Sequence, residues 1–329
     1  MIVTLTPNPS LDRTIELTGP LERGAVQRSR SSREEPGGKG VNISRALGAS
    51  GVLSLAILPG DGDDPVLRAL RAQNIPHLSL PLGARLRSNV AVTEPDGTTT
   101  KLNEPGPELS TEQQQNLIDL VLGHATGAAW LVLAGSLPPG VPADFYATLT
   151  AALRGRLGNR SPLVAVDSSG APLAAAIVAS PDLIKPNAEE LAELTGYPDP
   201  AGLEGDPARV ADLARTLVAR GVGAVLATLG SKGAVLTTAE GSWLAQTPPI
   251  RARSTVGAGD SSLAGYLLTH AEGGGPEARL RQAVAHGAAA AGLPGSTVPA
   301  RSQTSLEAVT VTPLAAPRIH PAAPASPSQ

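Results

Sequence analysis

A glycine-rich turn that ends in an acidic residue is the stretch of this sequence best suited to chemistry. It reads S-T-V-G-A-G-D-S from Ser254 to Ser261 and runs into an apolar helical pattern. Glycines let successive backbone N–H groups point at one spot, and the N-terminus of a following helix adds positive potential. Such a turn can hold a developing phosphoryl charge, and a carboxylate at the position of Asp260 can accept the proton of an attacking hydroxyl. From this pattern alone, a helix cap is an equally good interpretation of Asp260.

Two further stretches place polar residues where helices are predicted to begin. One reads P-G-G-K-G-V-N from Pro36 to Asn42, and the other reads K-P-N-A-E-E-L from Lys185 onward. In the second, Asn187 and Glu190 have the spacing of a capping box, which explains them without any ligand. No G-x-x-x-x-G-K-[S/T] loop occurs, so phosphates are not expected to be held in the P-loop manner.

In this order the three stretches resemble the motifs of the ribokinase-like carbohydrate kinases, the PfkB family. The resemblance runs from residue 1 to about residue 310. It implies a Rossmann-like, mainly parallel α/β sheet flanked by helices, with a small β-sheet lid. ATP and Mg²⁺ are the implied co-substrates, and a sugar hydroxyl is the implied acceptor. On matched positions Gly257, Ala258 and Gly259 form the anion hole and Asp260 is the base.

The resemblance also implies which residues bind the substrates. Sugar contacts are expected from Asp12, Gly37, Gly38, Lys39, Asn42, Arg87 and Asn89. Nucleotide contacts are expected from Lys185, Asn187, Thr228, Gly230, Gly233, Thr255 and His286. Asn187 and Glu190 are expected to organise Mg²⁺ through water, because this small cation dehydrates reluctantly. The resemblance is also compatible with a homodimer formed through the lid.

Several shorter segments point to a substrate that is already phosphorylated. Ser254 stands where most sugar kinases of the superfamily carry Asp, and T-P-N-P-S-L-D, A-G-S-L-P-P-G and D-S-S-G resemble the hexose-phosphate branch. G-G-K-G around Lys39 resembles the kinases of fructose 1-phosphate and of tagatose 6-phosphate more than the minor kinase of fructose 6-phosphate, and no residue separates the first two. Within this resemblance we expect fructose 1-phosphate, phosphorylated at its 6-hydroxyl to fructose 1,6-bisphosphate. Lys39 and Arg87 are expected to hold its phosphate jointly, although a lone cation is most often a solvated surface charge.

Other functions remain open at this point. Tagatose 6-phosphate and fructose 6-phosphate are alternative substrates, and a non-catalytic sugar-phosphate sensor is an alternative of another class. A dinucleotide-binding oxidoreductase is excluded, because no G-x-G-x-x-G opens a helix after the first strand.

Alternating apolar runs and helical patterns predict the elements that position these residues. Strands are predicted at 130–134, 163–167 and 224–228, with a helix between Asp206 and Gly221 that carries Asp206 as N-cap and Pro207 at its first position. Two segments break the rhythm, about 12–35 and 87–102. The second reads as a hairpin turning at Asp96-Gly97, and both are expected to form the lid.

Composition limits the setting and the partners. The 329 residues carry a net charge of -3, so no general basic field attracts nucleic acid or an anionic membrane. Cysteine is absent and a strand begins at Ile2 without a signal-like segment, so we expect a cytoplasmic protein. From Val311 the chain is rich in Pro, Ala and Ser, which predicts a disordered tail over 311–329.

Overall fold

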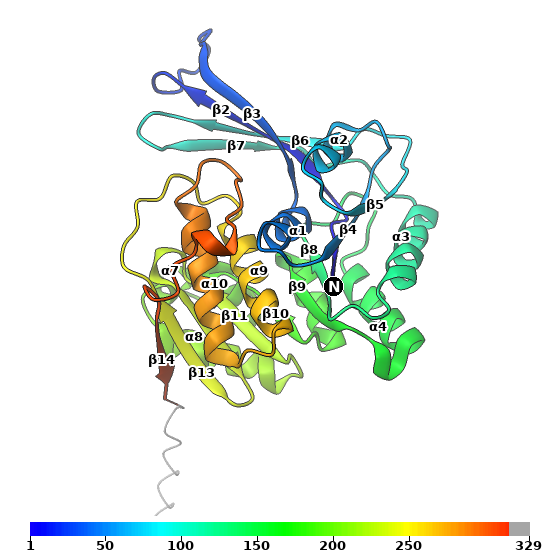
Figure 1. Ribbon diagram of the computed structural model, residues 1–329, viewed down its shortest axis with the longest axis vertical. Helices are drawn as coiled ribbons and strands as arrows, with labels where there is room; N and C mark the ends of the chain where they lie inside the picture. The colour runs from blue at the N-terminus through cyan, green and yellow to red at the C-terminus, as the bar shows by residue number, and fades with distance from the viewer. Residues whose placement is uncertain (316–329) are drawn as a thin grey trace, which may run out of the picture.

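The computed structural model describes residues 1–315, and two β-sheets organise them (Figure 1). The larger sheet has the strand order β14-β13-β12-β11-β10-β9-β8-β1-β4-β5. Neighbours from β11 to β5 are parallel, and β12, β13 and β14 continue the sheet antiparallel. Its strands are β1 (Ile2–Leu5), β4 (Ser54–Pro59), β5 (His77–Leu80), β8 (Trp130–Ala134), β9 (Leu163–Asp167), β10 (Leu183–Ile184), β11 (Ala224–Thr228), β12 (Ala234–Thr238), β13 (Gly241–Gln246) and β14 (Thr310–Leu314).

Helices cover both faces of this sheet, so its strands are apolar on both sides. In β8, Trp130 and Val132 belong to one core cluster, and Leu131 and Leu133 belong to the other. The first cluster is closed by α1 (Lys39–Ala49), α9 (Ala258–Ala271) and α10 (Pro276–Ala291), with α2 (Pro65–Ala72) over β4 beside it. The second is closed by α3 (Thr111–His124), α4 (Phe145–Leu157), α5 (Gly170–Ala176), α6 (Ala188–Thr195), α7 (Pro200–Leu203) and α8 (Pro207–Ala219). This is the predicted ribokinase-like α/β fold.

Local signals in the sequence locate several of these elements correctly. Strands β8, β9 and β11 coincide with the predicted ranges, and α8 begins at Pro207. The Asp206 side chain accepts a hydrogen bond from the backbone N–H of Arg209, as predicted for an N-cap. Capping residues and proline at the first helical turn therefore identified the start of α8.

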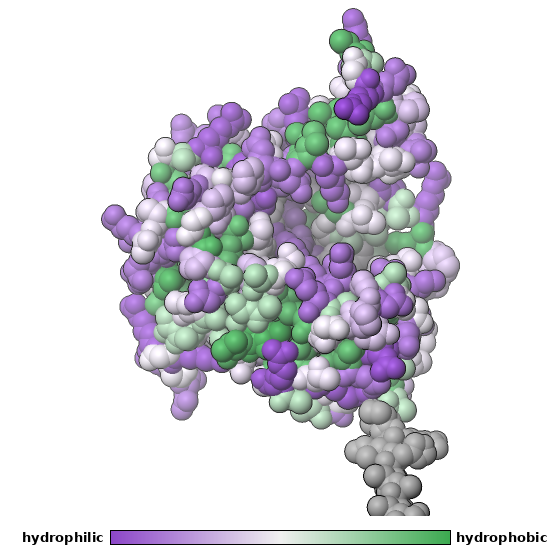
Figure 2. All heavy atoms as spheres, turned by 180° about the vertical axis from the view of Figure 1, so that it is seen from behind, coloured by the Kyte–Doolittle hydropathy of each residue, from purple (hydrophilic) through white to green (hydrophobic). Residues whose placement is uncertain are grey.

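The two segments that break the α/β rhythm form a separate sheet, which projects from the body of the molecule (Figure 1). This small sheet has the order β3-β2-β6-β7, with β2 (Ser10–Leu17), β3 (Ser29–Gly37), β6 (Arg87–Thr93) and β7 (Thr99–Asn103). Strands β6 and β7 form the predicted hairpin, and Gly97 in its turn has a φ of 95°. Seen from behind, a recess separates the small sheet from the body (Figure 2). We use "small sheet" for these four strands.

The predicted boundary of the C-terminal tail at residue 311 is wrong. Residues Thr310–Leu314 form β14, which pairs antiparallel with β13, and Val311 packs against the core beneath the sheet. Pro313 is compatible with this strand because β14 lies at the edge of the sheet. The rest of the tail, 316–329, lies outside the described residues.

Within residues 1–315, none of the helices combines the length and the apolar character that crossing a lipid bilayer requires.

Candidate active site

The glycine-rich turn forms the N-terminus of α9, as the sequence predicts. Gly257 has a φ of 75°, a left-handed conformation that favours glycine, and it precedes the first helical residue, Ala258. Asp260 lies in this first turn and is 7% exposed. Its Oδ2 accepts a hydrogen bond from Asn42 Nδ2 at 2.8 Å, and no side-chain capping bond is made at the start of α9. The Asp260 carboxylate is therefore directed toward α1, which favours a site residue over a helix cap.

The P-G-G-K-G-V-N stretch brings α1 to the same place. Gly38 precedes α1 with a φ of 107°. A side chain at Gly37 would collide with the Asp12 carboxylate, so glycine there lets backbone and carboxylate approach each other. Asn42 then lies one turn into α1 and is 4% exposed.

A buried carboxylate and two lysines lie beside Asp260. Asp167, at the end of β9, is fully buried, and its Oδ1 lies 2.7 Å from Lys39 Nζ. Its Oδ2 lies 3.2 Å from Lys185 Nζ, and Gly259 packs against the end of the Lys185 side chain. The second lysine therefore lies next to the first turn of α9, so both cations flank the turn that is suited to an anion.

Electrostatics set the protonation of this group of residues. Burial alone would raise the pKa of Asp167, but Lys185 and Lys39 outweigh it and hold that pKa below the usual range. Burial alone would lower the pKa of Lys39, but Asp167 and Asp260 raise it. Burial and the neighbouring Asp167 charge raise the pKa of Asp260 to about 6. Asp260 is thus ionised at neutral pH, and its pKa is close enough to neutrality for it to accept a proton.

The small sheet supplies a second set of polar side chains. Asp12 Oδ1 accepts hydrogen bonds from Ser10 Oγ at 2.6 Å and from Asn89 Nδ2 at 3.1 Å. Burial raises the pKa of Asp12, while these hydrogen bonds and the Arg87 charge oppose the shift. Asp12 is paired with Asn89 across β2 and β6, and Asn89 is paired with Asn103 across β6 and β7, so the three side chains share one face of the small sheet.

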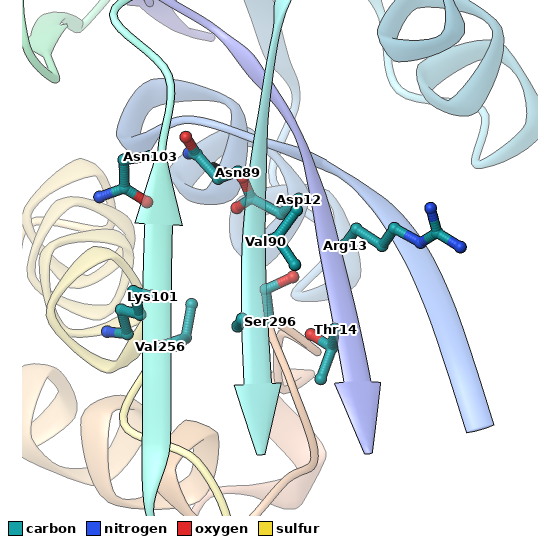
Figure 3. A pocket seen from close by; sticks show the side chains of 10 residues that line it. Asp12, Arg13, Thr14, Asn89, Val90, Lys101, Asn103, Val256 and Ser296 are labelled. Carbon is teal, nitrogen blue, oxygen red and sulfur yellow. Dashed lines mark hydrogen bonds between the residues drawn. The ribbon is translucent and has the colours of Figure 1, made fainter. Parts of the chain in front are cut away.

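This face borders a cavity of about 190 Å³ (Figure 3). Asp12 and Asn89 lie on one side of it, and Lys101 and Asn103 enter from β7. Val256, the residue before Gly257, also lines it. The remaining lining residues are Arg13, Thr14, Val90, Ala91 and Ser296. The cavity therefore lies between the face of the small sheet that carries Asp12 and the segment that leads into α9.

The structure does not bring Lys39 and Arg87 together. Arg87 donates from Nε and Nη2 to the carbonyl oxygen of Asn8 at 3.2 and 2.9 Å, and from Nη1 to that of Glu104 at 3.3 Å. Burial lowers the pKa of Arg87 and the Asp12 charge opposes this shift, whereas the carboxylates that act on Lys39 are Asp167, Asp260 and Glu190. Lys39 thus lies with the residues around Asp260, and Arg87 lies with those around Asp12.

Only some of the residues predicted to contact the nucleotide lie close to the N-terminus of α9. Lys185 lies beside α9, and Thr255 is exposed just before the glycine-rich turn. Thr228 forms an isolated bridge with Asn187, which places the end of β11 next to the start of α6. Gly230 and Gly233 lie in the turn between β11 and β12, where a side chain at Gly233 would collide with the Ala245 carbonyl. Turn packing therefore explains Gly233 without a ligand.

The environment of His286 gives no support to its predicted contact with the nucleotide. Its side chain is fully buried in α10, where Nδ1 lies 2.8 Å from Gln282 Nε2, and Nε2 lies 3.2 Å from Ser50 Oγ. Burial lowers the pKa of His286 to about 4, so the ring is neutral. Packing between α10 and the end of α1 occupies both ring nitrogens.

Asn187 and Glu190 form the capping box that the sequence allows. Glu190 Oε2 accepts from the Asn187 N–H at 2.8 Å, and Asn187 Oδ1 accepts from the Glu190 N–H at 2.7 Å. Across residues 1–315, no cluster of three or more acidic, histidine or cysteine side chains could hold a metal by itself. Two oxygen donors at the edge of the site fit a Mg²⁺ ion held mainly by water and nucleotide phosphates.

Sequence reasoning missed several residues of this site. Asp167 was noticed only within D-S-S-G at the end of a predicted strand, although a carboxylate at the carboxyl end of a parallel strand is itself a signal for a site. Lys101 and Asn103 follow from the hairpin register, because they alternate with Leu102 on β7. No sequence pattern pointed to Ser296, because it lies in the irregular segment after α10.

Comparisons with known proteins agree with this geometry. The chain matches the pfkB family of carbohydrate kinases over residues 5–303. It is 36% identical to the 1-phosphofructokinase of Xanthomonas campestris over 80% of this chain and 82% of that protein. It is 34% identical to the ATP-dependent 6-phosphofructokinase isozyme 2 of Mycobacterium tuberculosis over 90% of this chain and 85% of that protein.

A solved structure extends the likeness to the three-dimensional fold. Phosphofructokinase-2 from Escherichia coli, crystallised with fructose 6-phosphate, superposes with a TM-score of 0.80 at 30% identity, covering 92% of this chain and 96% of that one. Sequence motifs, site geometry and these likenesses all span nearly the same residues, and on these grounds the chain belongs to the pfkB family of carbohydrate kinases.

Proposed function

We propose that this protein transfers the γ-phosphoryl group of ATP to the 6-hydroxyl of fructose 1-phosphate, giving fructose 1,6-bisphosphate and ADP. The observation that carries the proposal is the position of Asp260. It lies in the first turn of α9, is held by Asn42, and is flanked by Lys39 near the cavity lined by Asp12 and Asn89. A base, an anion-binding turn and a polar cavity are the parts that phosphoryl transfer to a hydroxyl requires.

The reaction follows from these positions. The substrate hydroxyl loses its proton to the Asp260 carboxylate while its oxygen attacks the γ-phosphorus, and the bond to the ADP oxygen breaks in line. Backbone N–H groups of Gly257 to Gly259 and the Lys39 and Lys185 ammonium groups stabilise the charge on the transferred group. Asn187 and Glu190 would hold Mg²⁺ through water, and this ion would neutralise charge on the nucleotide phosphates.

The proposal that the substrate already carries a phosphate rests on the positions of two cationic side chains, Arg87 and Lys39. Arg87 lies near Asp12, and each of its terminal nitrogens carries a further N–H beyond those bound to carbonyl oxygens. We assign the phosphate already on the sugar to Arg87 and the transferred group to Lys39. Relatives named 1-phosphofructokinase support fructose 1-phosphate, and the M. tuberculosis and E. coli enzymes support fructose 6-phosphate as the alternative. Tagatose 6-phosphate remains a third candidate.

Steady-state kinetics with purified protein and Mg·ATP test the proposal. We expect the highest kcat/KM with fructose 1-phosphate among fructose 1-phosphate, fructose 6-phosphate, tagatose 6-phosphate and ribose. Phosphorus NMR of the product should show phosphate on both C1 and C6. A higher kcat/KM with another sugar would reassign the substrate. Tight sugar-phosphate binding with no ADP formation would establish a sensor instead.

We further propose a homodimer formed through the small sheet. Its face opposite Asp12 carries Ile15, Val90, Val92 and Leu102, by alternation with the cavity-facing residues, and Leu102 is 61% exposed. An exposed apolar sheet face favours association. Light scattering coupled to gel filtration should give the mass of a dimer for the wild type and of a monomer for Leu102→Asp. A wild-type monomer at micromolar concentration would contradict the proposal.

A further inference from the structure

The buried side chain of Arg45 joins α1, the small sheet and the segment after α10. It lies on α1, one turn after Asn42, and is 5% exposed. Its Nη2 donates to Glu35 Oε1 at 3.0 Å, and its Nη1 donates to Asn42 Oδ1 at 3.2 Å and to the Ser296 carbonyl oxygen at 3.1 Å. Its Nε donates to Gln73 Oε1 at 3.0 Å. A buried guanidinium in contact with both α1 and the small sheet therefore lies next to the residue that holds Asp260.

These contacts fix the orientation of the Asn42 amide. Arginine carries only hydrogen-bond donors, so the amide oxygen of Asn42 must face Arg45. The amide nitrogen then faces Asp260 and donates to its Oδ2 at 2.8 Å. The reversed amide would set N–H against N–H and oxygen against the carboxylate. Asn42 is 4% exposed, so water does not relieve these repulsions.

Glu35 connects the same group of residues to the small sheet. It lies on β3 directly opposite Asp12 on β2, and its Oε2 accepts from Ser296 N at 3.3 Å and from Ser296 Oγ at 2.9 Å. The Glu35 and Arg45 side chains are 13% and 5% exposed. Breaking such a buried ion pair is costly, so displacement of the small sheet would disturb Arg45.

We propose that Arg45 is a positioning residue, which holds the Asn42 amide in the orientation that donates to Asp260 and, through Glu35, makes this orientation depend on the placement of the small sheet. The effect of Arg45 on catalysis rests on the proposed function. The effect of Arg45 on the hydrogen bond between Asn42 and Asp260 does not, because it can be measured without any reaction.

The surroundings of Asp260 make the proposal measurable. The charged groups that act on Asp260 are Asp167 from β9, Lys39 from α1 and Lys185 from the segment after β10. Asp167 and burial raise the pKa of Asp260, while Lys39, Asn42 and Lys185 lower it. Loss of Arg45 leaves these three charges in place, but it releases the Asn42 donor and also removes the positive charge of the guanidinium, and both changes raise the pKa of Asp260. Arg45→Lys separates the two effects, because it keeps the charge and changes the geometry.

The experiment compares Arg45→Met with Arg154→Met as a matched control. Arg154 also binds backbone carbonyl oxygens and a carboxylate, those of Ala179, Ser180 and Asp182, but it lies on α4 away from the site. Proteins labelled with ¹³C at aspartate carboxyls are titrated by NMR without substrate, and Asp260→Asn identifies the Asp260 signal. We expect the pKa of Asp260 to rise by about one unit in Arg45→Met, as for loss of one hydrogen bond to a charged group, and to stay unchanged in the control. A folded Arg45→Met with the wild-type pKa overturns the proposal.

Two further variants complete the test. If Arg45→Met does not fold, Arg45→Lys replaces it, because an ammonium keeps the charge but cannot reach Asn42 and Glu35 together. An upward shift supports the proposal, and an unchanged pKa overturns it. Glu35→Ala should also raise the pKa of Asp260, and an unchanged pKa in this variant would remove the link to the small sheet.

The outcome for Arg45 can be told apart from the outcome for the proposed function. If the wild type phosphorylates no sugar phosphate, the proposed function fails while this titration still decides the role of Arg45. If it is active, the acid limb of kcat/KM should move by the same amount as the NMR pKa.

Discussion

At the scale of single residues, the site places two buried carboxylates near each other, and the two lysines form direct ion pairs with only one of them. Asp167 is bound by both Lys39 and Lys185, whereas Asp260 receives one hydrogen bond from a neutral amide. The two pKa values are therefore pushed in opposite directions. This division keeps Asp167 ionised beside the lysines, and it gives Asp260 the pKa that the proposed role as base requires.

Replacement of Asp260 by Asn keeps the size of the side chain and an oxygen for Asn42 to bind, but removes the base. We expect kcat to fall by about 10²–10⁴-fold, the usual contribution of general-base catalysis, with little change in KM for the sugar phosphate. Steady-state kinetics at pH 7.5 measure both. A variant that keeps the wild-type kcat would show that another group accepts the proton.

The same replacement should stabilise the fold in a pH-dependent manner. The pKa of Asp260 is raised from 3.8 to about 6 in the folded protein, so the folded state binds the proton more tightly than the unfolded state. Its contribution to the free energy of unfolding is favourable below about pH 4 and is lost as the pH rises through 6. We expect the melting temperature of Asp260→Asn to exceed that of the wild type above pH 6 and to approach it near pH 4. Equal differences at both pH values would contradict the raised pKa.

Arg87 and Lys39 should have separable effects. Arg87→Met should raise KM for the sugar phosphate at least about 30-fold, because losing one partner of a desolvated charge pair costs on the order of 2–5 kcal/mol. Lys39→Met should lower kcat instead, and KM for ATP should change little in Arg87→Met. Arg13→Met is the control, since the Arg13 guanidinium lies by Ser32 and Glu34 of β3, directed away from the cavity that the residue borders (Figure 3), and the side chain is 47% exposed. Strong coupling in the double mutant would mean that one phosphate binds both residues after all.

At the scale of elements, the start of α6 has an observed capping role and a proposed role in holding Mg²⁺, and one substitution can separate them. Glu190→Gln keeps the capping box with Asn187, because glutamine serves equally at this position, but removes the charge. We expect an unchanged unfolding midpoint and a higher Mg²⁺ concentration for half-maximal rate. Glu190→Ala should in addition destabilise the fold by about 1 kcal/mol. An unchanged Mg²⁺ requirement in both variants would leave only the capping role.

Elements with local signals could be predicted, and contacts between distant elements could not. Capping residues located α8, and apolar runs located β8 and β9, because these signals lie within a few residues of each other. The pair between Lys39 and Asp167 joins positions 128 apart, and a lone lysine gives no sign of its partner. For His286, the position along a helix gave no sign that the ring is directed into the protein, against Gln282.

At the scale of the whole molecule, β14 changes what a truncation should do. Ending the chain after Thr310 removes most of β14, including Val311 from the core, so we expect a lower unfolding midpoint. Ending it after Ala315 keeps the strand and removes only the Pro, Ala and Ser-rich segment, whose composition offers little to bury. Thermal unfolding of both truncated proteins beside the full chain provides the comparison. Equal midpoints for both truncations would mean that β14 contributes nothing to stability.

The small sheet is assembled from chain segments that are far apart, and this has a consequence for the order of folding. Strands β2 and β3 are consecutive in the chain and joined by the loop 18–28, but β2 reaches its parallel partner β6 only after β3, α1, β4, α2 and β5 intervene. The hydrogen bond between Asp12 and Asn89 closes a separation of 77 positions. Long separations slow the closure of such contacts, because the entropy of the intervening chain must be lost before the contact forms. We therefore expect that, during synthesis, β2 and β3 pair early, while the face of the small sheet that carries Asp12 and Asn89 is completed only after the elements between β3 and β6 have been made.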